Sequence, residues 1–131
     1  MIAFISGHLD LTVDEFDEHY GPLIKDAVSR GDTFVLGDAK GTDTFALQYL
    51  LAQRASGVTL YHMLVCPRIS TQVIFSIKDQ INLRIVGGFK SDEERDAAMT
   101  AVSDYDIAWV RPGREKSGTA KNLLRRKIEQ T

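Results

Sequence analysis

Three short loops in this chain place glycine beside hydroxyl or carboxyl side chains, and each comes soon after an apolar run. The loops are Ser6-Gly7-His8, residues 37–43 (GDAKGTD) and Ser117-Gly118-Thr119. Glycine lets the backbone approach a ligand closely, and the first N–H groups of a helix have no partner inside it. Since these groups lie at the positive end of the helix dipole, we predict that residues 117–119 bind a phosphate group.

The central loop has side chains that suit a sugar. Asp38 or Asp43 can accept hydrogen bonds from ribose hydroxyls beside a phosphate pocket. The loop is not a Walker loop, because no Gly-Lys-Ser/Thr follows, and it is not the Gly-x-Gly-x-x-Gly fingerprint. Each of these loops also has an interpretation without a ligand. The central loop can be a turn, Ser117 can be a simple N-cap, and His8 can be a loop histidine whose hydrogen bonds are all made within the protein. The candidate ligand contacts in the central loop are Gly37, Asp38, Gly41, Thr42 and Asp43.

A parallel sheet would bring these loops to one edge. Strand-type runs occupy residues 2–5, 33–36, 58–65 and 106–110. Helical spacing begins at residue 13, after residue 43, and at residues 92 and 117. Strands that alternate with helices predict an α/β fold, and we expect residues 1–131 to form one Rossmann-like domain. That domain would be a three-layer α/β/α sandwich with a mostly parallel sheet of about five strands. Ligands bind such sheets beyond the carboxyl ends of the strands.

Several local features are specific enough to test. Thr12 and Glu15 have the spacing of a capping box, so a helix should begin at Val13, and Gly21-Pro22 should split it. Residues 106–110 should form a buried strand. Residues 73–75 and 81–86 should be strands, either as a hairpin or as an added edge pair. In the last helix the spacing places Ala120, Leu123, Leu124 and Ile128 inside and Lys121, Arg125, Arg126 and Lys127 outside.

The composition excludes several functional classes. A net charge of −2 gives no general attraction to nucleic acid, so nucleic-acid binding is unlikely, and the basic last helix is interpreted as a solvated face. The single cysteine, Cys66, excludes an internal disulfide, and the spacing of His19 and His62 is not that of a zinc site. No signal peptide or membrane span is predicted. We expect a cytoplasmic protein with no metal and no cofactor.

Several motifs, in order along the chain, resemble the superfamily that joins the lonely-guy phosphoribohydrolases with the DNA-processing protein A fold. Residues 94–99 (ERDAAM) resemble the family's Glu-Arg-Lys-x-x-Met, Ser103-Asp104 resembles its Ser-Asp, and Gly118-Thr119 resembles part of its Pro-Gly-Gly-x-Gly-Thr-x-x-Glu. The likeness covers most of the chain outside residues 68–89. It implies a Rossmann-like domain that binds nucleotides or their derivatives, and it implies a homo-oligomer, expected to be a dimer.

The resemblance departs from the family at one catalytic position. In that family an arginine matching Arg95 and the glutamate of Gly-Thr-x-x-Glu cleave an N-glycosidic bond of a nucleoside monophosphate. Residues 117–120 also resemble the Ser-Gly-Thr-Ala of nucleoside deoxyribosyltransferases, in which a glutamate two residues further is the nucleophile. Asn122 stands at both glutamate positions. An amide supplies no negative charge, so Glu115 or Asp43 would have to replace it.

Three functions are therefore expected, in order of preference. The first is binding of a nucleotide or nucleotide-derived ligand, either a nucleoside monophosphate or an ADP-ribose-like molecule, with Arg111, Arg114 or Lys116 gripping its phosphate. The second is an enzyme, an N-glycosidic hydrolase or transferase acting on a nucleoside 5′-monophosphate. The third is an interaction domain with a vestigial pocket.

Overall fold

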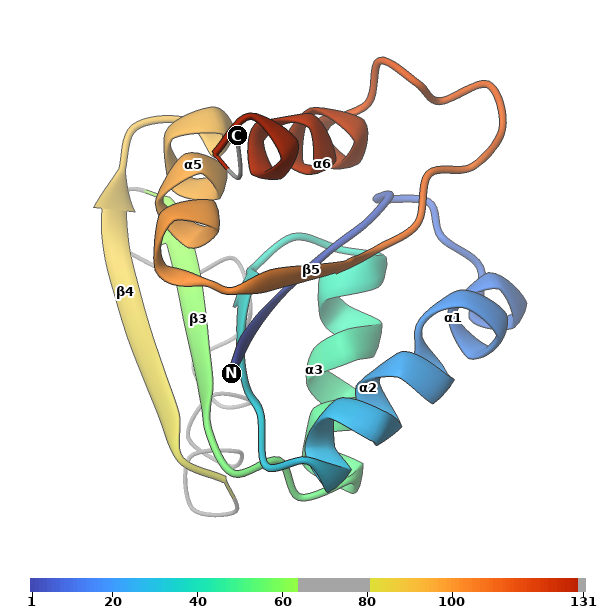
Figure 1. The fold of residues 1–131 in the computed structure, drawn as a ribbon, viewed down its shortest axis with the longest axis vertical. Coiled ribbons are helices and arrows are strands. Elements are labelled where there is room, and N and C mark those ends of the chain that lie inside the picture. Colours follow the sequence, from blue (N-terminus) through green and yellow to red (C-terminus); the bar gives the residue numbers. More distant parts are fainter. Residues whose placement is uncertain (64–80, 130–131) are drawn as a thin grey trace.

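The computed structural model describes residues 1–63 and 81–129 and shows a five-stranded sheet in the order β4-β3-β2-β1-β5 (Figure 1). Every strand pair is parallel, which confirms the predicted α/β class. The strands are β1 (Ile2–Ser6), β2 (Thr33–Gly37), β3 (Val58–Met63), β4 (Leu83–Phe89) and β5 (Tyr105–Ala108). The helices are α1 (Val13–His19), α2 (Gly21–Ser29), α3 (Thr42–Ala52), α5 (Asp92–Val102) and α6 (Gly118–Glu129).

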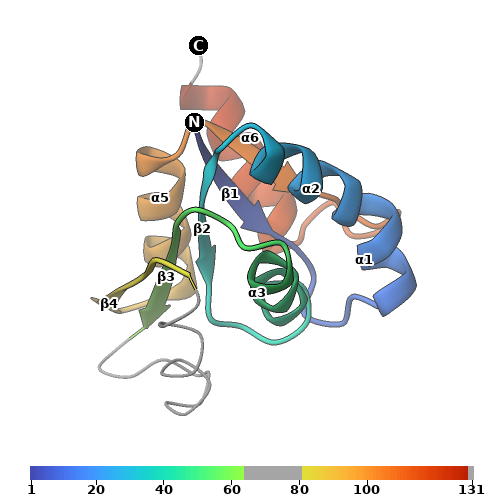
Figure 2. The same ribbon diagram turned by 90° about the horizontal axis from the view of Figure 1, so that it is seen from below.

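Helices cover both faces of the sheet. Figure 2 shows α1, α2 and α3 on one side and α5 on the other, and α6 packs against α5 and β5. Alternation along β1 explains the two cores, because Ala3 and Ile5 join the α1–α3 side while Phe4 packs with Met99 of α5. The connection from β4 to β5 runs back across the sheet, so a right-handed crossover places its helix on the opposite face from α1–α3.

Local signals in the sequence fix three helix boundaries. Thr12 caps α1 with its hydroxyl, which accepts from Glu15 N at 3.1 Å, while Thr12 N donates to the Glu15 side chain at 3.0 Å. Gly21 begins a new helix, so the predicted split is confirmed. Ser91 caps α5 by accepting from Glu94 N at 3.0 Å.

Two strand predictions need correction. β5 ends at Ala108 and is an edge strand in which only Ile107 is buried, because β1 is its single neighbour in the sheet. Trp109 N leaves the ladder and donates instead to the Tyr20 hydroxyl at 3.0 Å. β4 spans Leu83–Phe89 in place of the predicted 81–86, and it pairs in parallel with β3 at the edge of the sheet. The predicted strand at residues 73–75 and the end of the one at 58–65 lie outside the described residues.

The buried face of α6 also differs from the prediction. Leu124 and Ile128 are 57% and 65% exposed, whereas the side chain of Arg126 is 11% exposed. The reason is Asp106 of β5, a half-buried residue whose side chain is only 5% exposed and pairs with Arg126 at 3.3 Å. Arg126 Nη1 also donates to the carbonyls of Thr100 and Ser103 at the end of α5, where a helix dipole favours a cation.

Candidate functional site

The three glycine loops converge on one pocket of about 390 Å³. Ser6-Gly7-His8 leaves β1, residues 37–43 leave β2, and residues 117–119 begin α6 after β5. β1 and β5 are neighbours in the sheet, and the helices that follow them cover opposite faces, since α1 lies on the side of α2 and α3 while α6 packs with α5; ligands favour such a switch point. The candidate residues that line the pocket are Ser6, Gly7, His8, Gly37, Asp43, Arg95, Ser117, Gly118, Thr119 and Asn122.

The start of α6 forms one wall. Ser117 Oγ accepts from Ala120 N at 3.2 Å, as an N-cap does. Within the part of the chain that the structure describes, nothing accepts a hydrogen bond from the backbone N–H of Gly118 or Thr119. A Cβ at Gly118 would meet no atom within 4 Å. Two donors at the positive end of α6 are therefore available beside open space.

The end of β1 forms another part of the pocket lining. Ser6 lines the pocket, is 7% exposed, and its Oγ has no hydrogen-bond partner among the described residues. Gly7 is required by packing, because a Cβ there would overlap Thr42 Oγ1 and the Tyr20 hydroxyl. Tyr20 donates to Ser6 O at 2.7 Å, and its burial raises the pKa of Tyr20 to about 12. Ser6 is thus held by its backbone while its hydroxyl is left without a partner.

Gly41 and Thr42 support this wall from behind and do not line the pocket. Thr42 donates to His8 O, from its hydroxyl at 2.9 Å and from its backbone N at 3.2 Å. Gly41 has a φ of 75°, and a Cβ there would overlap the Leu9 carbonyl. Both residues were predicted from the sequence to contact a ligand. In the structure they contact His8 and Leu9 and help to position them.

Arg95 lies at the base of the pocket among four carboxylates. Its side chain is 7% exposed and pairs with the fully buried Asp38 at 3.1 Å, with Asp96 at 3.1 Å and with Asp92 at 3.3 Å. Asp38 is not in the lining, so of the two predicted sugar contacts only Asp43 faces the pocket. Asp43 accepts from Ala39 N at 3.1 Å, and burial raises the pKa of Asp43 to about 7.

Asn122 is engaged at both ends of its amide. Nδ2 donates to Asp96 Oδ2 at 3.1 Å, and Oδ1 accepts from Arg125 at 2.6 Å. Asp96 also accepts from Arg95 Nε and Nη2, so it joins α5 to α6 beside the pocket. Asp96 was not predicted as a site residue from the sequence. One feature of the sequence could have identified Asp96: it is an acid directly after Arg95, at the position where the motif that residues 94–99 resemble has lysine.

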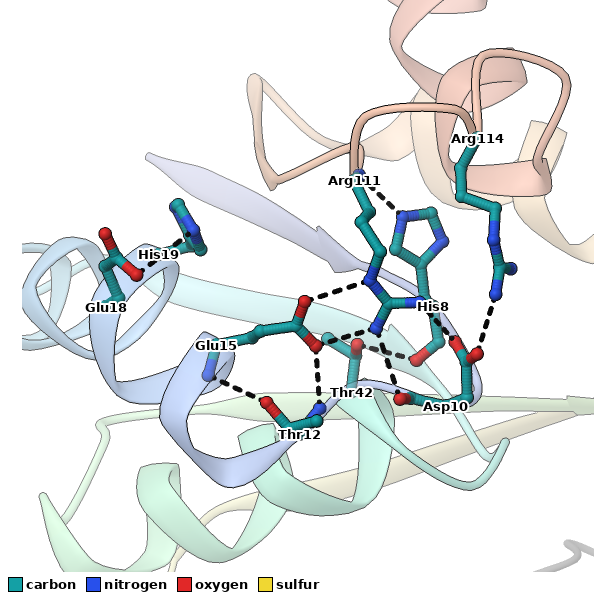
Figure 3. Close-up of polar contacts among 9 residues, drawn as sticks. All are labelled: His8, Asp10, Thr12, Glu15, Glu18, His19, Thr42, Arg111 and Arg114. Carbon is teal, nitrogen blue, oxygen red and sulfur yellow. Dashed lines mark hydrogen bonds and ion pairs between the residues drawn. The ribbon is translucent and has the colours of Figure 1, made fainter.

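Arg111 and Glu115 lie outside the lining. Arg111 donates to Glu15 at 2.7 and 2.9 Å and to Asp10 at 3.2 Å (Figure 3). Glu115 is exposed and accepts from Gly113 N at 3.1 Å. Glu115 is therefore not among the residues that line the pocket, whereas Asn122 is. Four carboxylates, those of Asp10, Asp43, Asp92 and Asp96, line the pocket, and Asp96 contacts Asn122 directly.

His8 is buried in the pocket wall and has a defined tautomer. Its Nε2 accepts from Arg111 N at 2.9 Å, so Nδ1 carries the proton of the neutral ring. Burial first, and then the charge of Arg111, lower the pKa of His8. Its ring meets Trp109 edge-on with centroids 6.2 Å apart. His8 both lines the pocket and fixes the position of the following loop.

Comparisons with known proteins were made against family models and curated sequences. No family model and no curated protein matches this chain.

Within residues 1–63 and 81–129, no three His, Cys, Asp or Glu side chains are grouped to hold a metal ion. No helix in the same ranges has the length and apolar character needed to cross a membrane. The chemistry of the pocket is the basis for a functional proposal.

Proposed function

We propose that this pocket binds a nucleotide or nucleotide-derived ligand, of the nucleoside monophosphate or ADP-ribose-like class. The observation that carries the proposal is that two sets of polar groups line the same pocket without hydrogen-bond partners among the described residues. The open N-terminus of α6 lines the pocket, and so does Ser6, whose buried hydroxyl has no partner among the described residues. A buried hydroxyl without a hydrogen bond costs about 1–3 kcal/mol, which a bound oxygen would recover.

The phosphate is proposed to lie against Gly118 and Thr119. Their free N–H groups and the dipole of the 12-residue α6 both favour an anion. Gly118 has no Cβ, so the backbone can approach the phosphate oxygens without obstruction. The nearby Ser117 hydroxyl caps the helix and keeps this geometry fixed.

The sugar is proposed to lie toward the carboxylates. Asp43 and Asp96 line the pocket and can accept hydrogen bonds from vicinal hydroxyls. A volume of about 390 Å³ falls at the small end of the usual range for ligand sites, about 300–1,000 Å³. A small sugar phosphate therefore suits the pocket in size as well as in polarity.

A second candidate function is hydrolysis or transfer at the N-glycosidic bond of a nucleoside 5′-monophosphate. The observation that favours it is Asp96, a carboxylate held in the pocket by Arg95 and Asn122. A fixed carboxylate can stabilise an oxocarbenium-like centre, which Asn122 cannot do. Asp43 is the alternative carboxylate, in its protonated form suited to general acid catalysis near neutral pH.

One experiment separates these functions. The protein is incubated with nucleoside monophosphates, ADP-ribose and NAD, the melting temperature is recorded, and released base is measured by chromatography. A ligand-dependent rise in melting temperature without released base supports binding. Base release that Asp96→Asn removes supports the enzyme. Neither a shift nor released base with any compound contradicts both functions and leaves the interaction domain.

A matched pair of variants controls for nonspecific effects. Gly118→Val places a side chain over the proposed phosphate and should abolish the ligand-dependent shift while the fold remains. Lys121→Ala, on the exposed face of the same helix, should leave the shift unchanged. Retained affinity in Gly118→Val contradicts the placement of the phosphate. The cytoplasmic location and the homodimer belong to the same proposal, and sedimentation equilibrium measures the latter.

A further inference from the structure

The loop between β5 and α6 carries three basic residues that could grip an anion, and the structure distinguishes them. This connecting loop (residues 109–117) is attached at its start, where Trp109 N donates to Tyr20 and Arg111 N donates to His8. Two turns follow, with Arg114 N donating to Arg111 O at 2.9 Å and Ser117 N donating to Arg114 O at 3.0 Å. The loop therefore has a fixed path beside the pocket.

Arg111 is committed to anchoring this loop. Its Nε and Nη2 donate to Glu15, and the remaining edge donates to the side chain and the carbonyl of Asp10. Its side chain is 24% exposed and does not line the pocket. A guanidinium with both edges engaged has little capacity for a new anion. Lys116 is exposed and is likewise absent from the lining.

Arg114 differs from both. It lines the same pocket as Ser117 and Gly118, and within the described ranges its side chain has one hydrogen-bond partner, Asp10 Oδ2 at 2.6 Å (Figure 3). The two side chains are 45% and 57% exposed. Exposed ion pairs contribute only about 0–1 kcal/mol, so exchange of this partner costs little. Asp10 also lines the pocket, which places a carboxylate where a ligand anion would approach.

We propose that Arg114 is the anion-binding side chain of the pocket, and that the Asp10 carboxylate competes with a bound phosphate ester for it. Arg114 exchanges Asp10 for the phosphate held at the start of α6. A dianionic phosphate attracts a guanidinium more strongly than a singly charged carboxylate and offers it a bidentate edge. This inference rests on the proposed function and adds to it a specificity-determining residue and an internal competitor.

Two opposite effects follow from the exchange. Arg114→Ala should weaken binding of a phosphate ester about tenfold, because a charge-assisted hydrogen bond is lost. Asp10→Asn should tighten it about threefold, because the competing carboxylate is removed. The effect of Asp10→Asn should disappear once Arg114 is gone. Simple charge repulsion by Asp10 predicts instead the same tightening in both backgrounds.

The test is titration calorimetry of the whole chain with adenosine 5′-monophosphate, with adenosine as the comparison ligand. The variants are Arg114→Ala, Asp10→Asn, their combination, and Lys116→Ala as the control from the same loop. We expect the three effects above for the monophosphate, no change for Lys116→Ala, and equal adenosine affinity throughout. Arg114→Lys should recover part of the loss, and circular dichroism verifies folding.

Each contrary outcome has a distinct meaning. Wild-type affinity in Arg114→Ala, or equal tightening by Asp10→Asn with and without Arg114, overturns the exchange and leaves nucleotide binding intact. The exchange is also overturned if Arg114→Ala loses as much affinity for adenosine as for the monophosphate, because the arginine would then not contact the phosphate. Failure of the wild-type protein to bind the monophosphate overturns the proposed monophosphate site and this inference together.

Discussion

Arg111 donates two hydrogen bonds to the carboxylate of Glu15, from Nε at 2.9 Å and from Nη2 at 2.7 Å. The pair joins the start of α1 to the connecting loop, 96 residues further along the chain. Planar bidentate pairing of this kind is the strongest arrangement available to a guanidinium and a carboxylate. This pair holds the connecting loop in place beside the pocket, although neither residue lines the pocket.

This pair predicts a dependence of stability on acid pH. The hydrogen bond from Arg111 holds the pKa of Glu15 at about 2, below its ordinary value of 4.5. A lowered carboxyl pKa stabilises the fold above pH 4.5, and that stabilisation is lost as the pH falls through 2. Glu15→Gln should therefore melt below wild type at pH 7, and the difference should narrow between pH 4.5 and 3. A constant difference across that range contradicts the ion pair.

Asp43 predicts the opposite dependence of stability on pH. Burial raises the pKa of Asp43 to about 7, so the carboxyl is protonated in the folded protein while it is ionised in the unfolded chain above about pH 4. The unfolded state therefore binds fewer protons, and this residue lowers stability as the pH rises from about 4 to 7. Asp43→Asn should gain stability relative to wild type over that interval and then level off. Thermal melts at pH 4, 5.5, 7 and 8 measure this, and a flat difference contradicts the shifted pKa.

Two of the three glycines that line the pocket, Gly7 and Gly118, should respond differently to alanine. A Cβ at Gly7 would overlap Thr42 Oγ1 and the Tyr20 hydroxyl, which hold neighbouring elements together, whereas a Cβ at Gly118 meets no atom within 4 Å. Gly7→Ala should cost about 1–3 kcal/mol by overpacking, and Gly118→Ala should be neutral or stabilising by up to about 1 kcal/mol. Urea denaturation measures both. Equal effects would mean that the crowding at Gly7 is relieved by movement.

The buried pair of Arg95 and Asp38 should be coupled. Arg95→Met removes the guanidinium from a buried carboxylate and should cost about 3 kcal/mol, the lower end for a broken buried pair. Asp38→Asn in that background should recover part of the loss, because the neutral amide is cheaper to bury. A double-mutant cycle by chemical denaturation gives the coupling. Additive losses would show that the two groups do not interact.

The fold was accessible from local patterns. Capping at Thr12 and the break at Gly21 each depend on residues a few positions apart, so the sequence contains the full signal. Repeated strand, glycine loop and helix starts predicted a parallel sheet, and therefore which loops meet at its edge. Ten of the candidate residues line one pocket for this reason.

What the sequence did not predict depends on contacts between distant residues. Helical spacing alone placed Leu124 inside and Arg126 outside, whereas the buried side chain of Asp106, in a different element, draws Arg126 inward. Arg111 was a candidate for the ligand until its bond to Glu15 was known. Its neighbour Arg114, with the same charge, lines the pocket instead. Basic residues in one loop cannot be distinguished without the positions of the distant acids that hold them.

The central claim is that a nucleotide phosphate binds the first N–H groups of α6. The most direct measurement is a titration of ¹⁵N-labelled protein with adenosine 5′-monophosphate and with ADP-ribose, followed by amide chemical shifts. The proposal predicts saturable shifts for at least one ligand, largest at the amides of Gly118 and Thr119. Absence of saturable shifts with both ligands, or shifts confined to other parts of the chain, would contradict it.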